Sequence, residues 1–318
     1  MRVLLIFIRE TPFNAESVRT LPCGGTEKSA IFLAEALHLL GHEVFMSTTW
    51  EQYAAYRQQD FQCVITQDAT LLGHFPKAKR VWWLHQFADA PYIQHGIAFA
   101  RMFADQAVSL SVCQQRQFAE MLNFPSTLIP HGIWHHELAP LTEKIPYSMI
   151  YASTPYRGLQ QLPQMFRQIK QLQPKATLTV CSSMKTYGWD QEDVHYQALY
   201  DELKSIEGIR WTGSLNQIEL NQEFAKTSIF LYPCTYAETY GMVMDEAIAH
   251  GCIPVITELG ALSERFPASG KTPEQLLQMV HYLFENPHIQ LDHFKKVQRP
   301  VNWLEIGRRW HELVLAAD

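Results

Sequence analysis

Short apolar runs alternate with stretches of helical periodicity through the first 130 residues. Residues Val3 to Ile8 form a continuous apolar run, which predicts a strand buried on both faces. After a polar loop, apolar residues from Ala30 to Leu40 recur at helical spacing, and Gly41 ends that predicted helix. Further short strands are predicted at 44–47, 63–66, 81–84, 108–110 and 127–129. Such alternation predicts a doubly wound parallel sheet.

A second series of the same kind follows residues 139–146, a proline-bracketed segment that we interpret as a linker. The pattern predicts strands at 149–152, 177–180, 209–211, 229–232 and 253–256, and helices at 159–172, 218–226, 242–249, 273–285 and 303–315. The predicted class is therefore α/β, with two Rossmann-like domains at 1–142 and 146–300. Two such sheets that face each other would bind a ligand in a central cleft, at the carboxyl ends of their strands.

The net charge and the spacing of the cysteines argue against several classes of protein. The 26 basic and 32 acidic residues give a net charge of −6, which argues against a nucleic-acid-binding protein. None of the six cysteines forms a Cys-x-x-Cys pair, so reduced thiols in a cytoplasmic protein are expected. The amino-terminal run of six apolar residues is too short for a secretory signal core. No stretch approaches the ~18 apolar residues of a spanning helix.

Two segments combine glycine with the start of a predicted helix. Gly24-Gly25-Thr26 lies between the first strand and its helix, where backbone N–H groups and the helix dipole favour an anion. An ordinary turn is the other interpretation of this loop. Residues 236–247 follow an apolar strand and place Glu238 in the turn and Glu246 in the helix. A helix start between two carboxylates suits a ligand with a diphosphate flanked by hydroxyls, as in a nucleotide sugar.

The segment 236–247 resembles the E-x7-E motif of retaining GT-B glycosyltransferases, with Tyr240 where phenylalanine is usual. The resemblance extends along nearly the whole chain. It includes the glycine loop at 24–27, the Ile-Pro-His-Gly-Ile segment at 129–133 and Gly-Cys-Ile-Pro-Val-Ile at 251–256. It also includes a terminal helix, 302–318, that packs back on the first domain. The fold that the resemblance implies is GT-B.

The resemblance also implies roles for individual residues. Glu246 would accept hydrogen bonds from ribose hydroxyls, and Glu238 would contact the donor sugar. Arg157, before Gly158, would stabilise the leaving diphosphate. His85, at the end of a predicted strand, would lie near the sugar; a structural histidine is the alternative interpretation. The remaining donor contacts would come from Gly24, Gly25, Lys185, Gly213, Thr239, Tyr240, Gly241 and Met242.

Some positions depart from the family pattern. Residues 152–154 lack the arginine that often precedes the basic residue, and Lys185 either replaces it or is a solvated lysine. His131 stands where asparagine is usual. No Asp-x-Asp occurs, so we expect metal-independent transfer without a cofactor. UDP is favoured over GDP or ADP as the donor nucleotide, and a glycan or lipid-linked glycan is the expected acceptor.

Other functions remain open at this stage. A phosphorylase or sugar-nucleotide isomerase could use the same fold. A non-catalytic nucleotide-sugar binding module would agree with the missing cation. A dinucleotide dehydrogenase ranks last, because G-x-G-x-x-G is absent. The basic residues Lys295, Lys296, Arg299, Arg308 and Arg309 could touch an anionic inner membrane surface, although a solvated face is the favoured interpretation.

Overall fold

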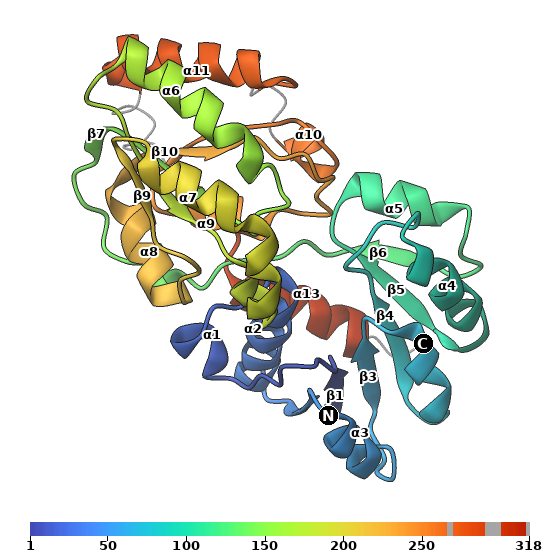
Figure 1. Ribbon diagram of the computed structural model, residues 1–318. Helices are drawn as coiled ribbons and strands as arrows, with labels where there is room; N and C mark the ends of the chain where they lie inside the picture. The colour runs from blue at the N-terminus through green and yellow to red at the C-terminus, as the bar shows by residue number, and fades with distance from the viewer. Residues whose placement is uncertain (266–269, 290–299, 316–318) are drawn as a thin grey trace. The chain divides into compact units, whose positions relative to one another are not determined.

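The computed structural model describes residues 1–265, 270–289 and 300–315, and the chain divides into two compact units. The first unit contains residues 1–17, 25–134 and 301–318, and the second contains 18–24 and 135–300. Each unit is built on one parallel sheet with helices packed against it (Figure 1). The predicted class, α/β with two Rossmann-like sheets, is confirmed.

The sheet of the first unit has six strands in the order β2-β1-β3-β4-β5-β6. All its neighbouring pairs are parallel. The apolar run at the amino terminus forms an interior strand of this sheet, where Val3, Leu4 and Leu5 are fully buried. The strands are β1 (Arg2–Ile6), β2 (Glu43–Ser47), β3 (Cys63–Thr66), β4 (Lys79–Trp83), β5 (Gln106–Ser109) and β6 (Ser126–Leu128).

The last helix of the chain belongs to the first unit. Helix α13 (Trp303–Leu315) packs on α2 (Gly25–Leu39), with Trp303 and Trp310 completely buried. The helices approach so closely that a Cβ at Gly307 would lie 2.7 Å from the Cβ of Ala36. The other helices of this unit are α3 (Trp50–Tyr56), η1 (Ala69–His74), α4 (Pro91–Phe103) and α5 (Val112–Ala119).

The sheet of the second unit has five parallel strands in the order β11-β10-β7-β8-β9. They are β7 (Ile145–Ala152), β8 (Thr177–Cys181), β9 (Ile209–Trp211), β10 (Thr227–Tyr232) and β11 (Ile253–Ile256). Among its described residues, the helical elements are α1 (Ser17–Thr20), η2 (His135–Glu137), η3 (Leu159–Gln161), α6 (Leu162–Leu172), η4 (Met184–Tyr187), η5 (Asp190–Tyr196), α7 (Gln197–Ser205), α8 (Gln217–Lys226), α9 (Met242–Ala249), α10 (Ala261–Arg265) and α11 (Pro273–Glu285).

Some element boundaries differ from the prediction. Strand β1 ends at Ile6 rather than Ile8. Strand β7 already begins at Ile145, so Pro146 belongs to the strand and not to a linker. The pairing of β7 with β10 shifts register just there, and an irregular ladder tolerates a residue without an N–H. The helix predicted from 159 begins as the 3-10 turn η3, and α6 starts at Leu162 with Pro163 in its first turn.

Candidate active site

The turn between β10 and α9 is fixed by two glycines. Gly241 has a φ of +82°, and a Cβ there would lie 2.8 Å from Cδ2 of Leu262. Gly260 has a φ of +62°, and a Cβ there would lie 2.6 Å from the carbonyl oxygen of Glu238. The N–H of Ala261 donates to that same carbonyl at 2.7 Å. The backbone of Glu238 is therefore held by close contact with Gly260 and by the hydrogen bond from Ala261. A side chain at position 241 or 260 would disturb this arrangement.

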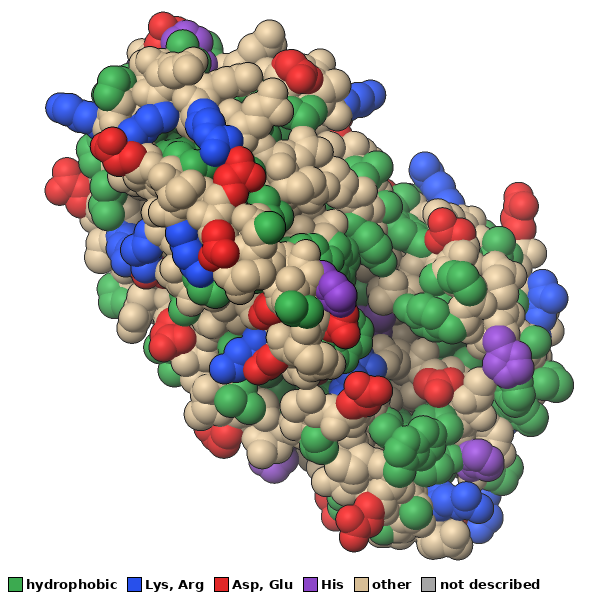
Figure 2. Space-filling view, viewed as in Figure 1, with side chains coloured by type: hydrophobic (Ala, Val, Ile, Leu, Met, Phe, Trp, Pro, Cys, Tyr) green, Lys and Arg blue, Asp and Glu red, His purple; other side chains and the backbone are tan. Residues whose placement is uncertain are grey.

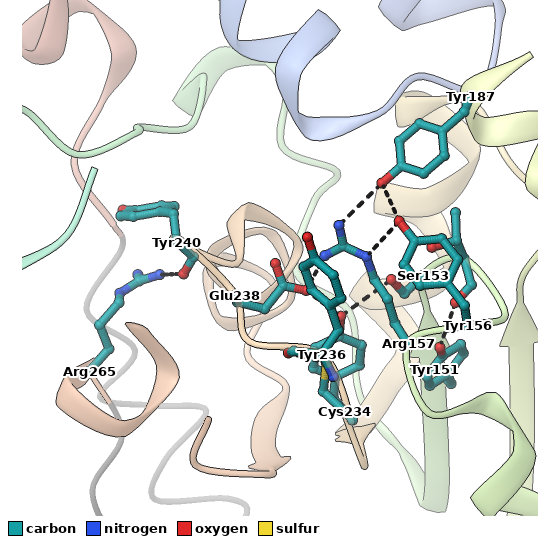
Figure 3. Close-up of polar contacts among 12 residues, drawn as sticks. Tyr151, Ser153, Tyr156, Arg157, Tyr187, Cys234, Tyr236, Glu238, Tyr240 and Arg265 are labelled. Atoms are coloured by element: carbon teal, nitrogen blue, oxygen red, sulfur yellow. Dashed lines mark hydrogen bonds and ion pairs between the residues drawn. The ribbon is translucent and has the colours of Figure 1, made fainter. Parts of the chain in front are cut away.

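The carboxylate of Glu238 is buried and receives two donors (Figure 3). Arg157 Nη1 and Tyr232 Oη both donate to Oε1, the tyrosine at 2.6 Å. The two charged side chains are only 18% and 9% exposed, so each compensates for the other's loss of water. Burial alone would lower the pKa of Arg157, but the facing Glu238 raises it well above its ordinary value. The guanidinium therefore stays charged at any physiological pH.

Aromatic rings surround this guanidinium. It lies 4.7 Å from the ring centre of Tyr236 and 5.5 Å from that of Tyr156. Its Nη2 donates to Tyr187 Oη at 3.3 Å, and Figure 3 shows Arg157 among these rings. Burial raises the pKa of the Tyr187 hydroxyl, which therefore remains a neutral hydrogen-bonding group. Sequence reasoning missed the tyrosines; Tyr156 beside Arg157 and Tyr236 beside the motif were the available signals.

Gly158 positions Arg157 against the turn. Its φ is +99°, and a Cβ there would lie 2.0 Å from the carbonyl oxygen of Pro233. The backbone next to Arg157 therefore touches the segment that follows β10. A glycine directly after the arginine is what permits this contact.

A second buried pair holds the start of α9. Arg265 donates to the carbonyl of Tyr240 at 2.8 Å and forms an ion pair with Asp245. The Tyr240 hydroxyl donates to the other carboxylate oxygen of Asp245 at 2.7 Å. Burial raises the pKa of Asp245, although Arg265 opposes the shift. Neither Asp245 nor Arg265 was predicted from the sequence, because nothing near position 265 marks it as a neighbour of the motif.

The predicted residues of the second unit thus divide into two groups. One group lies on the turn after β10, on α9 and on the loop that contacts this turn: Glu238, Tyr240, Gly241, Met242, the buried Glu246 and Arg157. Lys185 is exposed on η4, and it is Tyr187 of the same element that reaches Arg157. Gly213 follows β9, and Thr239 is half-buried in the turn.

The two glycines of the loop at 24–27 are assigned to different units. Gly24 is grouped with the second unit, whereas Gly25 is the exposed first residue of α2 in the first. Among the described residues, no heavy atom lies within 4 Å of a Cβ added at Gly25. Protein packing therefore does not require glycine at this position.

In the first unit, His85 follows β4 and is buried among other rings. It is stacked on His131, with ring centres 5.7 Å apart and an interplanar angle of 29°. Trp83 lies 4.7 Å away and Phe7 5.8 Å away. Burial, reinforced by His131 and Arg9, holds the pKa of His85 well below its ordinary value. The ring is therefore neutral near pH 7, a form that can both donate and accept a hydrogen bond.

Charges on the visible face of the molecule are interspersed in sign, without a broad basic field (Figure 2). Lys295, Lys296 and Arg299 of the predicted basic end lie outside the described residues. Over residues 1–265, 270–289 and 300–315, no group of three or more metal-ligating side chains is present. In the same ranges, no helix is both long and apolar enough to cross a membrane. None of the six cysteines, all of which lie within the described residues, forms a disulfide.

Comparisons with known proteins identify the family of the chain. The sequence model of the family described as glycosyl transferases group 1 matches residues 137–299. No curated protein is significantly similar to the chain in sequence.

Solved structures share the fold at low sequence identity. Sucrose-phosphate synthase from Thermosynechococcus elongatus matches with a TM-score of 0.79 and 15% identity, over 98% of both chains. HepE from Anabaena, in complex with UDP-glucose, matches with a TM-score of 0.72 and 15% identity, over 100% of both chains. WaaG, a glycosyltransferase involved in lipopolysaccharide biosynthesis, matches with a TM-score of 0.68 and 13% identity, over 99% of this chain and all of the other. The fold is that of GT-B glycosyltransferases.

Proposed function

Because the chain belongs to the group 1 glycosyl transferase family, we propose that it is a retaining enzyme that transfers a sugar from a nucleotide-diphosphate sugar to an acceptor hydroxyl. The observation that carries this proposal is the buried pair of Arg157 and Glu238 beside the start of α9. One fixed cation, one carboxylate and one helix amino terminus provide contacts for phosphate and for hydroxyl groups. UDP is the proposed nucleotide, in keeping with the UDP-glucose in the HepE structure.

The two glutamates have separate proposed roles. Glu246, on α9, accepts hydrogen bonds from the ribose, and Glu238, in the turn, accepts them from the donor sugar. The first N–H groups of α9, from Gly241 and Met242, lack intrahelical acceptors and would face the diphosphate. Tyr240 and Thr239 contribute backbone contacts, and Lys185 and Gly213 border the same end of the sheet.

Arg157 has the proposed task of stabilising the leaving diphosphate. During transfer, the bond between the sugar C1 and the phosphate oxygen breaks while the acceptor oxygen bonds to C1 on the same face. The acceptor proton passes to the departing phosphate oxygen, so no protein nucleophile is needed. Negative charge grows on the diphosphate in this step, and a positioned guanidinium stabilises it. The charge of Arg157 and the dipole of α9 would make the transfer independent of metal ions.

The first unit would supply the acceptor side. His85, held neutral, would hydrogen-bond a sugar hydroxyl. The glycine loop, with Gly24 in the second unit and Gly25 in the first, would let the backbone approach the diphosphate. We keep 1–142 with the terminal helix, and 146–300, as proposed domain boundaries. A cytoplasmic enzyme acting on a glycan or lipid-linked glycan, with peripheral contact at the inner membrane face, fits this scheme.

The test is calorimetric titration of the full chain with UDP, GDP and ADP, each alone and as its glucose conjugate. We expect one nucleotide to bind at micromolar concentration and Glu246→Ala to abolish that binding. The matched control is Glu207→Ala, because the Glu207 side chain is 95% exposed in the same unit. Absence of binding by any nucleotide to the folded protein would contradict the donor site.

Turnover separates the proposed enzyme from the alternatives. Transfer to an added glycan, with the anomeric configuration of the donor kept in the product by NMR, supports a retaining transferase. Consumption of the nucleotide sugar without any acceptor would indicate a phosphorylase or isomerase. Binding without turnover, unchanged by His85→Ala, would indicate a non-catalytic module.

A further inference from the structure

A cavity of about 490 Å³ opens in the first unit, beyond the carboxyl ends of β1, β2 and β3. Its volume falls within the ~300–1,000 Å³ of small-molecule sites. Strand β1 lies between β2 and β3, so the chain leaves β1 toward one side of the sheet and leaves β3 toward the other. The cavity therefore lies at the topological switch point, where doubly wound sheets bind their ligands. None of its lining residues belongs to the proposed donor site.

An exposed tryptophan forms one wall of this cavity. The Trp50 side chain is 64% exposed, although an indole is among the most favourable groups to bury. Thr49 and Gln52 form a capping box that sets the backbone at the start of α3, and the indole meets the ring of Tyr53 edge to face, 5.7 Å between centres. An indole face that borders a cavity suits the apolar C–H face of a sugar ring.

The charges of the cavity disfavour an anionic ligand. Its one arginine, Arg9, is already ion-paired with Glu27, and its Nη2 donates to Gln67 Oε1 at 3.3 Å. The remaining charged lining residues are Glu10 and Asp68, both exposed carboxylates. The unbalanced charge at the rim is therefore negative, so a phosphate or carboxylate on the ligand would be repelled. Carboxylates and an amide remain available to accept or donate hydrogen bonds to hydroxyl or amino groups.

The cavity lies beyond the end of β3, and the next strand in the sheet is β4, which leads to His85. Gln67, in its lining, accepts through its carbonyl oxygen from the indole Nε1 of Trp82 on β4 at 2.9 Å. The charge of Arg9 contributes to the low pKa of His85, after burial and His131. The lining residues Ile6 and Ile8 flank Phe7, whose ring centre lies 5.8 Å from that of His85, the histidine proposed to lie near the donor sugar.

We propose that this cavity is the acceptor site and that it binds an uncharged or amino-bearing sugar ring, stacked on Trp50, in preference to a phosphorylated or carboxylated sugar. Calling the cavity an acceptor site rests on the proposed transferase function. Sugar binding in the cavity does not rest on that function, so the experiments measure sugar binding and turnover separately.

The first measurement is saturation-transfer NMR on the full chain without any nucleotide, using glucose, glucosamine and glucose 6-phosphate as probes. We expect saturation of the glucose and glucosamine protons, and several-fold less on glucose 6-phosphate. Trp50→Ala should remove the effect, whereas Tyr92→Ala, an exposed aromatic of the same unit outside the cavity, should keep it. Equal saturation in the Trp50→Ala variant, or equal saturation of all three probes, would overturn the proposal.

The charge argument has its own variant. Asp68 accepts from the N–H of Thr70 at 3.0 Å at the start of η1, and asparagine can make the same cap. Asp68→Asn combined with Glu10→Gln should therefore keep the fold and raise glucose 6-phosphate binding toward that of glucose. An unchanged preference in this variant would contradict the assigned role of the two carboxylates.

Turnover distinguishes failure of this proposal from failure of the transferase function. With UDP-glucose as donor, Trp50→Ala should raise the KM for the acceptor at least tenfold and leave the dissociation constant of UDP unchanged. A normal acceptor KM in an active Trp50→Ala enzyme would overturn the acceptor site alone. Sugar binding that Trp50→Ala removes, in a protein that consumes no donor, would support the cavity and overturn the transferase function.

Discussion

The buried side chains beyond the strand ends are charged in the second unit and neutral in the first. In the second unit, a buried arginine and a buried glutamate meet, and tyrosine rings enclose them. In the first, His85 is stacked on His131 and flanked by Trp83, and burial keeps it neutral. A fixed cation suits a diphosphate, which gains negative charge as it leaves, and a neutral imidazole suits hydroxyl groups. The same doubly wound architecture therefore carries a charged polar cluster in one unit and a neutral aromatic cluster in the other.

The largest expected effect comes from removing the cation of the second unit. Arg157→Ala should lower kcat by about 10²–10³-fold, the loss that follows removal of one group stabilising developing charge. Arg157→Lys should recover part of the rate, because it keeps the charge but not the planar contacts with Tyr187 and the flanking rings. Initial rates with UDP-glucose measure both. A kcat for Arg157→Ala within twofold of wild type would contradict the proposed role of this charge in the second unit.

Two glycines should respond differently to alanine. Gly158→Ala places a Cβ against the Pro233 carbonyl at a φ of +99°, so we expect a loss of about 1–3 kcal/mol in the free energy of unfolding. Gly25→Ala meets no described atom, so stability should be unchanged while the donor KM rises. Urea titration followed by circular dichroism measures the first effect, and donor kinetics the second. Equal stability losses in the two variants would show that packing, and not a ligand, constrains Gly25.

The stability of the first unit should depend on pH below neutrality. Because burial lowers the pKa of His85 in the folded state, the unfolded chain binds the proton more readily. Stability should therefore fall as the pH drops below the unfolded value near 6.5, by up to about 1.4 kcal/mol per pH unit for one histidine. The free energy of unfolding from urea titrations at pH 7.5 and 5.5 should differ less in His85→Gln. His195→Gln, whose side chain is 71% exposed, is the control and should retain the wild-type difference.

The smallest effect should come from the hydroxyl that supports Glu238. Tyr232→Phe removes the 2.6 Å hydrogen bond but keeps the ring and the ion pair, so we expect a loss of about 0.5–1.5 kcal/mol. Transfer should slow by less than about tenfold, with the larger change in kcat. Steady-state kinetics over a range of donor concentrations separates kcat from KM. A loss as large as that of Arg157→Ala would mean that the tyrosine, and not the arginine, sets the position of Glu238.

Local sequence patterns predicted the strands and helices but not the contacts between side chains that lie far apart in the sequence. Apolar periodicity was enough for both sheets, and the helix predicted over 242–249 has the bounds of α9. The ion pair of Arg157 with Glu238 joins residues 81 positions apart, and the pair of Asp245 with Arg265 joins residues 20 apart. Such contacts depend on how strands are ordered in the sheet, which periodicity does not encode. The strand–turn–helix pattern pointed to Glu238 and the family resemblance to Arg157, whereas nothing in the sequence analysis pointed to Tyr187 or Arg265, which were found through the structure.

The position of α13 has a consequence for how the protein is made. The first unit buries Trp303 and Trp310, yet these residues are translated only after the whole of the second unit. At roughly 5–20 residues per second, the ribosome needs roughly ten to thirty seconds to synthesise the intervening segment, residues 135–300. During that interval the α2 surface around Ala36 has no helix to cover it. The second unit is thus able to complete its fold first, and the core of the first unit closes only after α13 has been synthesised.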